Sequence, residues 1–252
     1  MHQLILDLLP ETPPSLDNFV VGSNGEALAR LAGWLAADSR ETLLLLWGEP
    51  ASGKTHLLRA SGARYIDAQD DRALAGLEAA ESADDTMATT MTPESIPGIP
   101  TRASPVRYAI DNIEALDERG QIALFNLFNR LRATNGTGRL LAAAAAPPQQ
   151  LAVREDLRTR LGSGLVYRLQ PLSEAEQDAA LTAQAARRGL RLPTGALAYL
   201  RSRAPRDMRS LSALLDALDR YSLEQRRPIT LPLLREVLHP TPHTAAFQNN
   251  SE

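Results

Sequence analysis

Uninterrupted apolar runs alternate with amphipathic segments between residues 26 and 169. Such runs are typical of parallel strands that are buried on both faces of a sheet. They predict five strands, over 42–47, 63–67, 106–110, 139–143 and 166–169. Apolar residues return at helical spacing in 26–38, 54–63 and 118–132, which predicts helices between these strands. The alternation therefore predicts an α/β domain with a parallel sheet flanked by helices.

The pattern becomes wholly helical after Pro171. Ser173 and Glu176 form a capping box that begins a helix running to about Arg188, and further helices are predicted over 194–203, 207–225 and 231–238. The segment 84–105 is rich in Thr, Ser and Pro and predicts a mobile loop, whose role the sequence leaves open. We thus expect an N-terminal peptide (1–13), an α/β domain (14–171), a small all-helical lid (172–240) and a disordered tail (241–252).

Composition excludes several classes of protein. The absence of cysteine excludes a disulfide framework and a thiolate metal site. A formal net charge of -3 gives no overall attraction to nucleic acid or to a membrane. No stretch reaches the roughly 18 apolar residues of a membrane span, and the N-terminus lacks the basic region of a signal peptide. We therefore expect a soluble, cytoplasmic protein.

The segment Gly48–Thr55 matches the phosphate-binding pattern G-x-x-x-x-G-K-[ST]. In this pattern the glycines let backbone N–H groups wrap the phosphates, Lys54 reaches the β- and γ-phosphates, and the Thr55 hydroxyl holds Mg²⁺. Lys54 is also the only lysine, since the other 26 of the 27 basic residues are arginines. A buried strand precedes the segment and a helix follows, as the pattern requires. The alternative is a glycine-rich turn without a ligand.

The strand over 106–110 is followed by Asp111, as expected of a Walker B element. A carboxylate at this position would contribute to the Mg²⁺ shell of a bound ATP or ADP. Apolar strands often end in an acidic residue, so a plain strand cap is the alternative. The phosphate-binding motif upstream favours the metal-binding interpretation.

Several segments together resemble the family of the bacterial replication initiator DnaA, which has the AAA+ fold. The resemblance covers roughly residues 14–238 and is carried by Asp17-Asn-Phe-Val-Val-Gly22, Trp47 to Leu58, Ile110-Asp-Asn-Ile113 and Arg168-Leu-Gln-Pro-Leu172. It implies that Phe19, Val20 and Val21 lie beside the adenine, the alternative being an ordinary buried strand. The sequence itself does not decide between ADP and ATP.

The resemblance also implies roles for two arginines. Asp156-Leu-Arg-Thr-Arg160-Leu is similar to the family's box VII, whose final arginine is a finger that reaches the ATP of a neighbouring subunit. Arg160 is therefore the expected finger, with Arg158 as the nearby competitor. Asp207-Met-Arg209-Ser-Leu resembles the sensor 2 segment, which implies that Arg209 contacts the phosphates from the lid. The alternative for each is a solvated arginine.

The N-terminal segment Gln3-Leu-Ile-Leu-Asp-Leu8 resembles a peptide that binds the sliding clamp of DNA polymerase III, with Gln3, Leu4, Leu6 and Leu8 as the contacting residues. A strand that packs within the protein is the alternative. The chain ends soon after Leu238, so we expect no helix-turn-helix domain and only indirect contact with DNA, through the clamp. Together these features resemble the Hda family of DnaA regulators. That resemblance implies a negative regulator of replication initiation that, with the loaded clamp, promotes hydrolysis of DnaA-bound ATP.

Two departures from an active ATPase accompany this resemblance. Asn112 stands where an acid normally orients the attacking water, with Glu114 two residues further on. The expected sensor 1 position falls within 142–146, which is all alanine. We therefore expect weak hydrolysis by the protein alone. A self-sufficient ATPase such as a helicase loader, or a DnaA-like initiator module, remains the alternative, and the oligomeric state, including a homo-oligomer, stays open.

Overall fold

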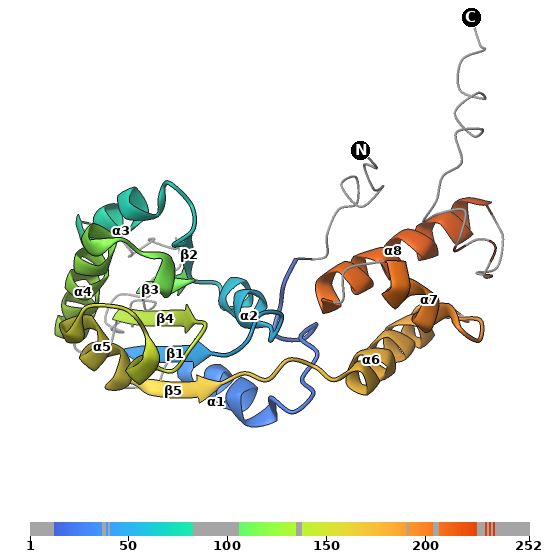
Figure 1. Ribbon diagram of the computed structural model, residues 1–252, viewed down its shortest axis with the longest axis horizontal. Helices are drawn as coiled ribbons and strands as arrows, with labels where there is room; N and C mark the ends of the chain where they lie inside the picture. Colours follow the sequence, from blue (N-terminus) through green and yellow to red (C-terminus); the bar gives the residue numbers. More distant parts are fainter. Residues whose placement is uncertain are drawn as a thin grey trace, which may run out of the picture. The chain divides into compact units, whose positions relative to one another are not determined.

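The computed structural model describes residues 13–36, 39, 41–82, 106–134, 138–190, 192–203, 207–225, 230, 232 and 234. Contacts divide the chain into two compact units, one formed by Pro14–Pro171 and one that contains the described residues of Leu172–Glu252. Each unit has a hydrophobic core of its own. The first unit holds all five strands, and the second is helical (Figure 1).

The five strands form one parallel sheet in the order β2-β3-β4-β1-β5. Their bounds are β1 Leu43–Trp47, β2 Arg64–Asp67, β3 Val106–Asp111, β4 Gly138–Ala144 and β5 Leu165–Arg168. Each expected strand is present, and its ends differ from the expected ones by only one residue. The chain crosses from β1 over β4 and β3 to reach β2, so the carboxyl end of β1 lies beside that of β4.

Successive side chains of the central strands enter two different cores. In β1, Leu43 and Leu45 belong to one buried cluster, and Leu44 and Leu46 belong to the other. A strand directs alternate side chains to opposite faces, so a strand covered on both faces is apolar throughout. The uninterrupted leucines of β1 are thus explained by helices on both sides of the sheet.

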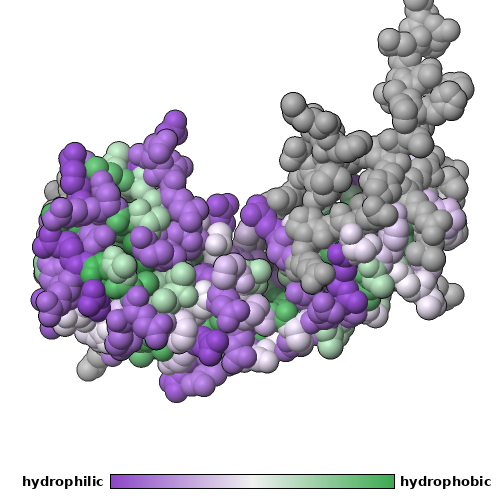
Figure 2. All heavy atoms as spheres, viewed as in Figure 1, coloured by the Kyte–Doolittle hydropathy of each residue, from purple (hydrophilic) through white to green (hydrophobic). Residues whose placement is uncertain are grey.

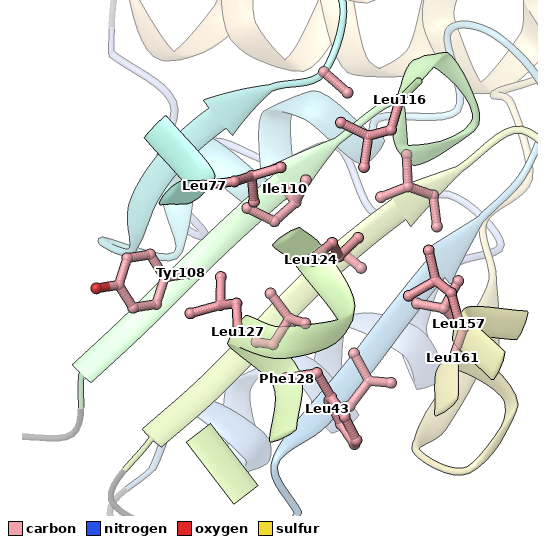
Figure 3. Packing of buried hydrophobic residues seen from close by; sticks show 14 of the residues in the cluster. Leu43, Leu77, Tyr108, Ile110, Leu116, Leu124, Leu127, Phe128, Leu157 and Leu161 are labelled. Atoms are coloured by element: carbon pink, nitrogen blue, oxygen red, sulfur yellow. The ribbon is translucent and has the colours of Figure 1, made fainter. Parts of the chain in front are cut away.

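One face of the sheet packs against α3 (Ala73–Ser82), α4 (Glu118–Ala133) and α5 (Glu155–Gly162). Figure 3 shows side chains of β1, β3, α3, α4 and α5 meeting in this cluster, among them Leu43, Ile110, Leu77, Leu124 and Leu157. The other face packs against α1 (Gly25–Leu35) and α2 (Lys54–Ala60). The first unit is therefore a three-layered α/β domain.

Helix ends differ from the expected positions where the backbone changes conformation. The helix expected over 54–63 ends at Ala60, because Gly62 takes a left-handed φ of 69°. The helix expected to extend to residue 38 ends at Leu35, since Ala36 is extended. Two helices that the sequence did not predict are α3 and α5. Short 3-10 turns, η3 (Ile113–Ala115) and η4 (Pro148–Gln150), follow β3 and β4.

The second unit contains α6 (Glu174–Arg187), α7 (Ala196–Arg203) and α8 (Met208–Gln225). The predicted capping box is confirmed, since Ser173 accepts from the Glu176 N–H and the Glu176 carboxylate accepts from the Ser173 N–H. Leu181, Leu200, Leu211 and Leu218 lie in the core of this lid. The helix expected over 231–238 falls almost wholly outside the described residues.

Polar side chains cover most of the first unit on the side drawn in Figure 2, and apolar residues show there only in small separate areas. Among the described residues, the large apolar side chains that are exposed are Val21 and Ile122. No helix in the described part of the chain is both long and apolar enough to cross a membrane.

Candidate functional site

The loop between β1 and α2 requires glycine at two positions. A Cβ at Gly48 would lie 2.2 Å from the backbone oxygen of Leu169, and a Cβ at Gly53 would lie 2.6 Å from Cε2 of Phe19. Gly53 also has a left-handed φ of 95°, which other residues rarely adopt. The Gly48 N–H donates to the Ala144 carbonyl at 3.2 Å and so ties the loop to β4. The loop backbone is therefore close-packed and fixed, as a phosphate-binding loop must be.

The Lys54 ammonium lies within this loop. Its Nζ donates to the carbonyl oxygens of Gly48 at 2.7 Å and Glu49 at 2.9 Å. Burial lowers the pKa of Lys54, and the carboxylates of Asp111 and Glu114 oppose this change. The ammonium is thus partly desolvated, a state that an anionic ligand would compensate. Thr55, which follows in the first turn of α2, is half-buried.

Asp111, the last residue of β3, is fully buried and both its carboxylate oxygens accept hydrogen bonds. Oδ2 accepts from the hydroxyl of Tyr65 at 3.0 Å, and Oδ1 accepts from the backbone N–H of Asn112 at 3.0 Å. Burial, and then the negative charge of Asp111, raise the pKa of Tyr65 far above its usual range. The Tyr65 hydroxyl therefore remains a donor to this carboxylate at every physiological pH.

Asn112 has a left-handed backbone with φ of 54°, and its amide nitrogen donates to Oδ1 of Asp67 at 2.9 Å. An amide that is held in this way is a poor candidate for orienting an attacking water. Glu114, two residues on, is exposed but close enough for its charge to oppose the lowering of the Lys54 pKa by burial. Strand β4 ends at Ala144, within the run of five alanines over 142–146. This run offers no polar side chain.

Phe19 lies against the loop at Gly53, and its ring centroid is 5.5 Å from that of His56 on α2. The Nε2 atom of His56 donates to the Ser15 carbonyl at 2.9 Å, which fixes the segment before Phe19 on α2. The alternative of an ordinary buried strand over 19–21 is wrong, since these residues form no strand. Phe19 and Val20 are half-buried, and Val21 is 37% exposed.

Arg160 and Arg158 both lie on α5, but their side chains are held differently. The Arg160 guanidinium is half-buried and lies 5.8 Å from the centroid of the Phe125 ring on α4. The Arg158 Nη2 donates to the Val153 carbonyl at 2.8 Å, and its Nε is buried. Arg158 is thus tied to its own backbone, whereas within the described part of the chain the guanidinium of Arg160 lies over an aromatic face. This geometry favours Arg160 as the arginine that a partner could meet.

Arg209 is the second residue of α8 in the lid unit, and its side chain is exposed. Asp207 begins this helix by accepting from the Ser210 N–H at 2.9 Å. The first unit brings Phe19, Gly48, Gly53 and Lys54 together around one loop. The expected clamp-binding residues Gln3, Leu4, Leu6 and Leu8, and the loop 84–105, lie outside the described residues.

Sequence reasoning missed three side chains of this site, namely Tyr65, Asp67 and His56. Tyr65 and Asp67 alternate along β2 and thus share one face of the sheet, and Asp67 is in register with Asp111. Polar residues at the carboxyl ends of parallel strands commonly line ligand sites, so the Tyr-Ile-Asp ending of β2 was the available signal. His56 is adjacent to the phosphate-binding motif but has no role in its pattern.

The described residues contain no group of three or more His, Cys, Asp or Glu side chains suited to a metal ion. Thr55 and Asp111 supply oxygen atoms, which are the ligands that Mg²⁺ prefers. A nucleotide phosphate bound in the loop would complete such a shell. The donor set therefore fits a metal that arrives with its nucleotide.

Residues 12–168 match the family of the bacterial DnaA ATPase domain, and the chain therefore belongs to this family of AAA+ proteins. After this segment, residues 174–238 match a second family, described as the lid domain of Hda. The protein is thus a DnaA-related, Hda-like AAA+ protein, as its sequence motifs suggested.

Solved structures agree with this fold. Domain III of the Thermotoga maritima DnaA is 21% identical, with a TM-score of 0.64 over 91% of this chain and 97% of that one. DnaA from Aquifex aeolicus, solved with AMPPCP bound, is 22% identical, with a TM-score of 0.57 over 84% of this chain and 69% of that one. The RuvB branch migration motor of Thermotoga maritima is 15% identical, with a TM-score of 0.56 over 90% and 71% of the two chains. The expected AAA+ fold with a helical lid is therefore confirmed.

Proposed function

We propose that the protein binds ADP or ATP together with Mg²⁺ in the loop over 48–55. The observation that carries this proposal is the half-buried Lys54 ammonium within a loop that tolerates no side chain at Gly48 or Gly53. Backbone N–H groups and Lys54 would hold the phosphates, and Thr55 and Asp111 would hold the metal. The AMPPCP in the Aquifex aeolicus DnaA supports an adenine nucleotide.

Two further contacts are proposed for the same nucleotide. Phe19, Val20 and Val21 would lie beside the adenine, which the position of the Phe19 ring against Gly53 supports. Arg209 would reach the phosphates from the lid.

Hydrolysis by the protein alone is proposed to be weak. The side-chain amide of Asn112 is not a base, and it already donates a hydrogen bond to Asp67 at 2.9 Å. Residues 142–146, at the end of β4, are all alanine and carry no polar side chain. Nucleotide would therefore persist in the site and support the fold rather than turn over. The surface that it stabilises would include α5, which carries Arg160.

With nucleotide bound, the protein would act on DnaA as a negative regulator of replication initiation. Arg160 would serve as an arginine finger in trans and stabilise the charge that develops on the ATP of DnaA during hydrolysis. The match to the lid domain of Hda and the half-buried Arg160 beside Phe125 support this role. The sliding clamp would recruit the protein through Gln3, Leu4, Leu6 and Leu8, so that DNA is contacted only indirectly.

A reconstituted reaction tests the proposal. DnaA loaded with radiolabelled ATP is mixed with DNA-loaded clamp and this protein, and the ADP formed on DnaA is followed with time. We expect rapid hydrolysis only when all components are present. Fast ATP turnover by the protein alone would instead support a self-sufficient ATPase. Salt-dependent binding to DNA without clamp would support an initiator-like module.

A further inference from the structure

The buried carboxylate of Asp111 is oriented by one side chain outside the recognised motifs. Among the described residues, the partner of Oδ1 is the adjacent backbone N–H of Asn112, which moves with the same turn. Oδ2 accepts from the Tyr65 hydroxyl at 3.0 Å, and Tyr65 belongs to the neighbouring strand β2. Buried polar groups are normally hydrogen-bonded, so a partner from another strand constrains the orientation of this carboxylate. Rotation of the Asp111 carboxylate is therefore restrained by Tyr65.

The Tyr65 ring is itself fixed on three sides. It pairs in register with Ala109, a small residue that leaves room for the ring to extend along the sheet toward Asp111. It packs against the buried cluster that includes the α2 residues Leu57 and Leu58. The Arg59 guanidinium, also from α2, lies 4.6 Å from the ring centroid. The hydroxyl is therefore held in one place by both the sheet and the helix that follows the phosphate-binding loop.

We propose that Tyr65 is a positioning residue for the nucleotide-associated Mg²⁺, acting by fixing the carboxylate of Asp111. The inference rests on the proposed binding of Mg²⁺ and nucleotide and adds a residue to that site. Side chains that hydrogen-bond a metal-binding carboxylate preorganise it, and their loss typically costs roughly 10- to 100-fold in metal affinity. With one oxygen occupied by Tyr65, the remaining lone pairs of Asp111 keep a constant direction toward the metal shell.

The experiment compares Tyr65→Phe with the control Tyr108→Phe. Tyr108 lies on the adjacent strand β3, its hydroxyl accepts from Arg64 at 3.5 Å, and that guanidinium lies 5.6 Å from its ring centroid. It therefore matches Tyr65 in residue type and in the arginine beside its ring, but it belongs to the opposite face of the sheet, where Figure 3 shows its hydroxyl directed away from the packed leucines. Binding of fluorescent ADP is measured in EDTA and across a Mg²⁺ titration, at a temperature where circular dichroism shows each variant folded.

We expect Tyr65→Phe to require about ten times more Mg²⁺ for half of the metal-dependent gain in ADP affinity, with unchanged affinity in EDTA. Tyr108→Phe should match the wild type in both conditions. The double variant Tyr65→Phe/Asp111→Asn should have the same Mg²⁺ requirement as Asp111→Asn alone, because the two residues act through one contact. A thermal destabilisation of Tyr65→Phe leaves the comparison intact, since only folded protein is measured.

Three results would overturn the inference. An unchanged Mg²⁺ requirement in Tyr65→Phe, with a wild type that responds to Mg²⁺, rejects the role of Tyr65 and leaves the proposed function standing. An equal loss of ADP affinity with and without Mg²⁺ shows that the hydroxyl serves the fold or the nucleotide rather than the metal. If the wild type binds no ADP, or binds it equally well with and without Mg²⁺, the proposed site for Mg²⁺ with nucleotide is rejected. The role of Tyr65 is then rejected as well.

Discussion

We predict that Arg160→Ala removes the stimulation of DnaA-bound ATP hydrolysis but changes the stability of the protein only slightly. In the structure the Arg160 guanidinium makes one cation–π contact, with Phe125 at 5.8 Å. Such a contact at a half-buried position contributes about 0.5–1 kcal/mol to the free energy of unfolding. For a chain of this size a loss of about 1 kcal/mol lowers the melting temperature by about 2–4 °C. The variant should therefore remain folded and bind ADP normally.

The effect of the same change on catalysis should be far larger. An arginine finger acts on the charge of the transition state and increases the rate of hydrolysis by about 10³–10⁵-fold. This corresponds to roughly 4–7 kcal/mol of activation free energy, several times the expected loss in stability. The assay is hydrolysis of DnaA-bound ATP in the presence of DNA-loaded clamp. Arg160→Lys should fail as well, because an ammonium cannot form the two parallel hydrogen bonds of a guanidinium.

Arg158→Ala is the matched control on the same helix. It removes a hydrogen bond to the Val153 carbonyl and a partly buried stem, so it should lower the free energy of unfolding by about 1 kcal/mol or more. Once differences in folded protein are accounted for, it should retain most of the stimulation. Loss of stimulation in Arg158→Ala with full activity in Arg160→Ala would mean that the wrong arginine has been chosen. Full activity in both variants would reject the finger mechanism.

Further predictions concern the nucleotide, the loop and the clamp. Lys54→Ala should weaken ADP binding about 10- to 100-fold in calorimetry, because a charge-assisted phosphate contact is lost; equal affinity would reject the loop as the site. Gly53→Ala should weaken ADP binding and lower the melting temperature, since a Cβ would lie 2.6 Å from Phe19 on a left-handed backbone. Gln3→Ala with Leu4→Ala should abolish co-purification with the clamp at an unchanged melting temperature; retained clamp binding would rule out the N-terminal assignment.

The sequence was informative wherever one local property determined the structure. The strands could be predicted because each is apolar on both faces, and Leu43–Trp47 shows this most clearly. The loop could be predicted because only glycine tolerates the conformation of residue 53. By contrast, α5 was not predicted as a helix, since its only buried residues are Leu157 and Leu161 and the rest is mostly polar. Two apolar residues four positions apart are too few for a helical pattern.

The side-chain contacts of the site depend on strand order, which the hydrophobic pattern does not contain. The bond from Tyr65 to Asp111 exists because β2 is an edge strand beside β3, with Asp67 opposite Asp111. The different surroundings of Arg158 and Arg160 likewise depend on how α5 lies against α4 and the preceding loop. The motif predicted which residue types gather at the site, whereas the topology decides which of them touch.

Nucleotide binding and nucleotide hydrolysis require different groups in the site, and the position of Asn112 concerns only hydrolysis. The proposed binding would rely on loop N–H groups, Lys54 and Asp111, none of which requires a base at the next position. Hydrolysis requires a group that orients water, yet the Asn112 amide is turned to Asp67 on a left-handed backbone with φ of 54°. Glutamate there would suffer both the left-handed strain that asparagine tolerates and repulsion from Asp67. The backbone at this turn, and not only the identity of one side chain, would therefore oppose hydrolysis by the protein alone, whereas the proposed role of Arg160 on α5 concerns a partner's ATP.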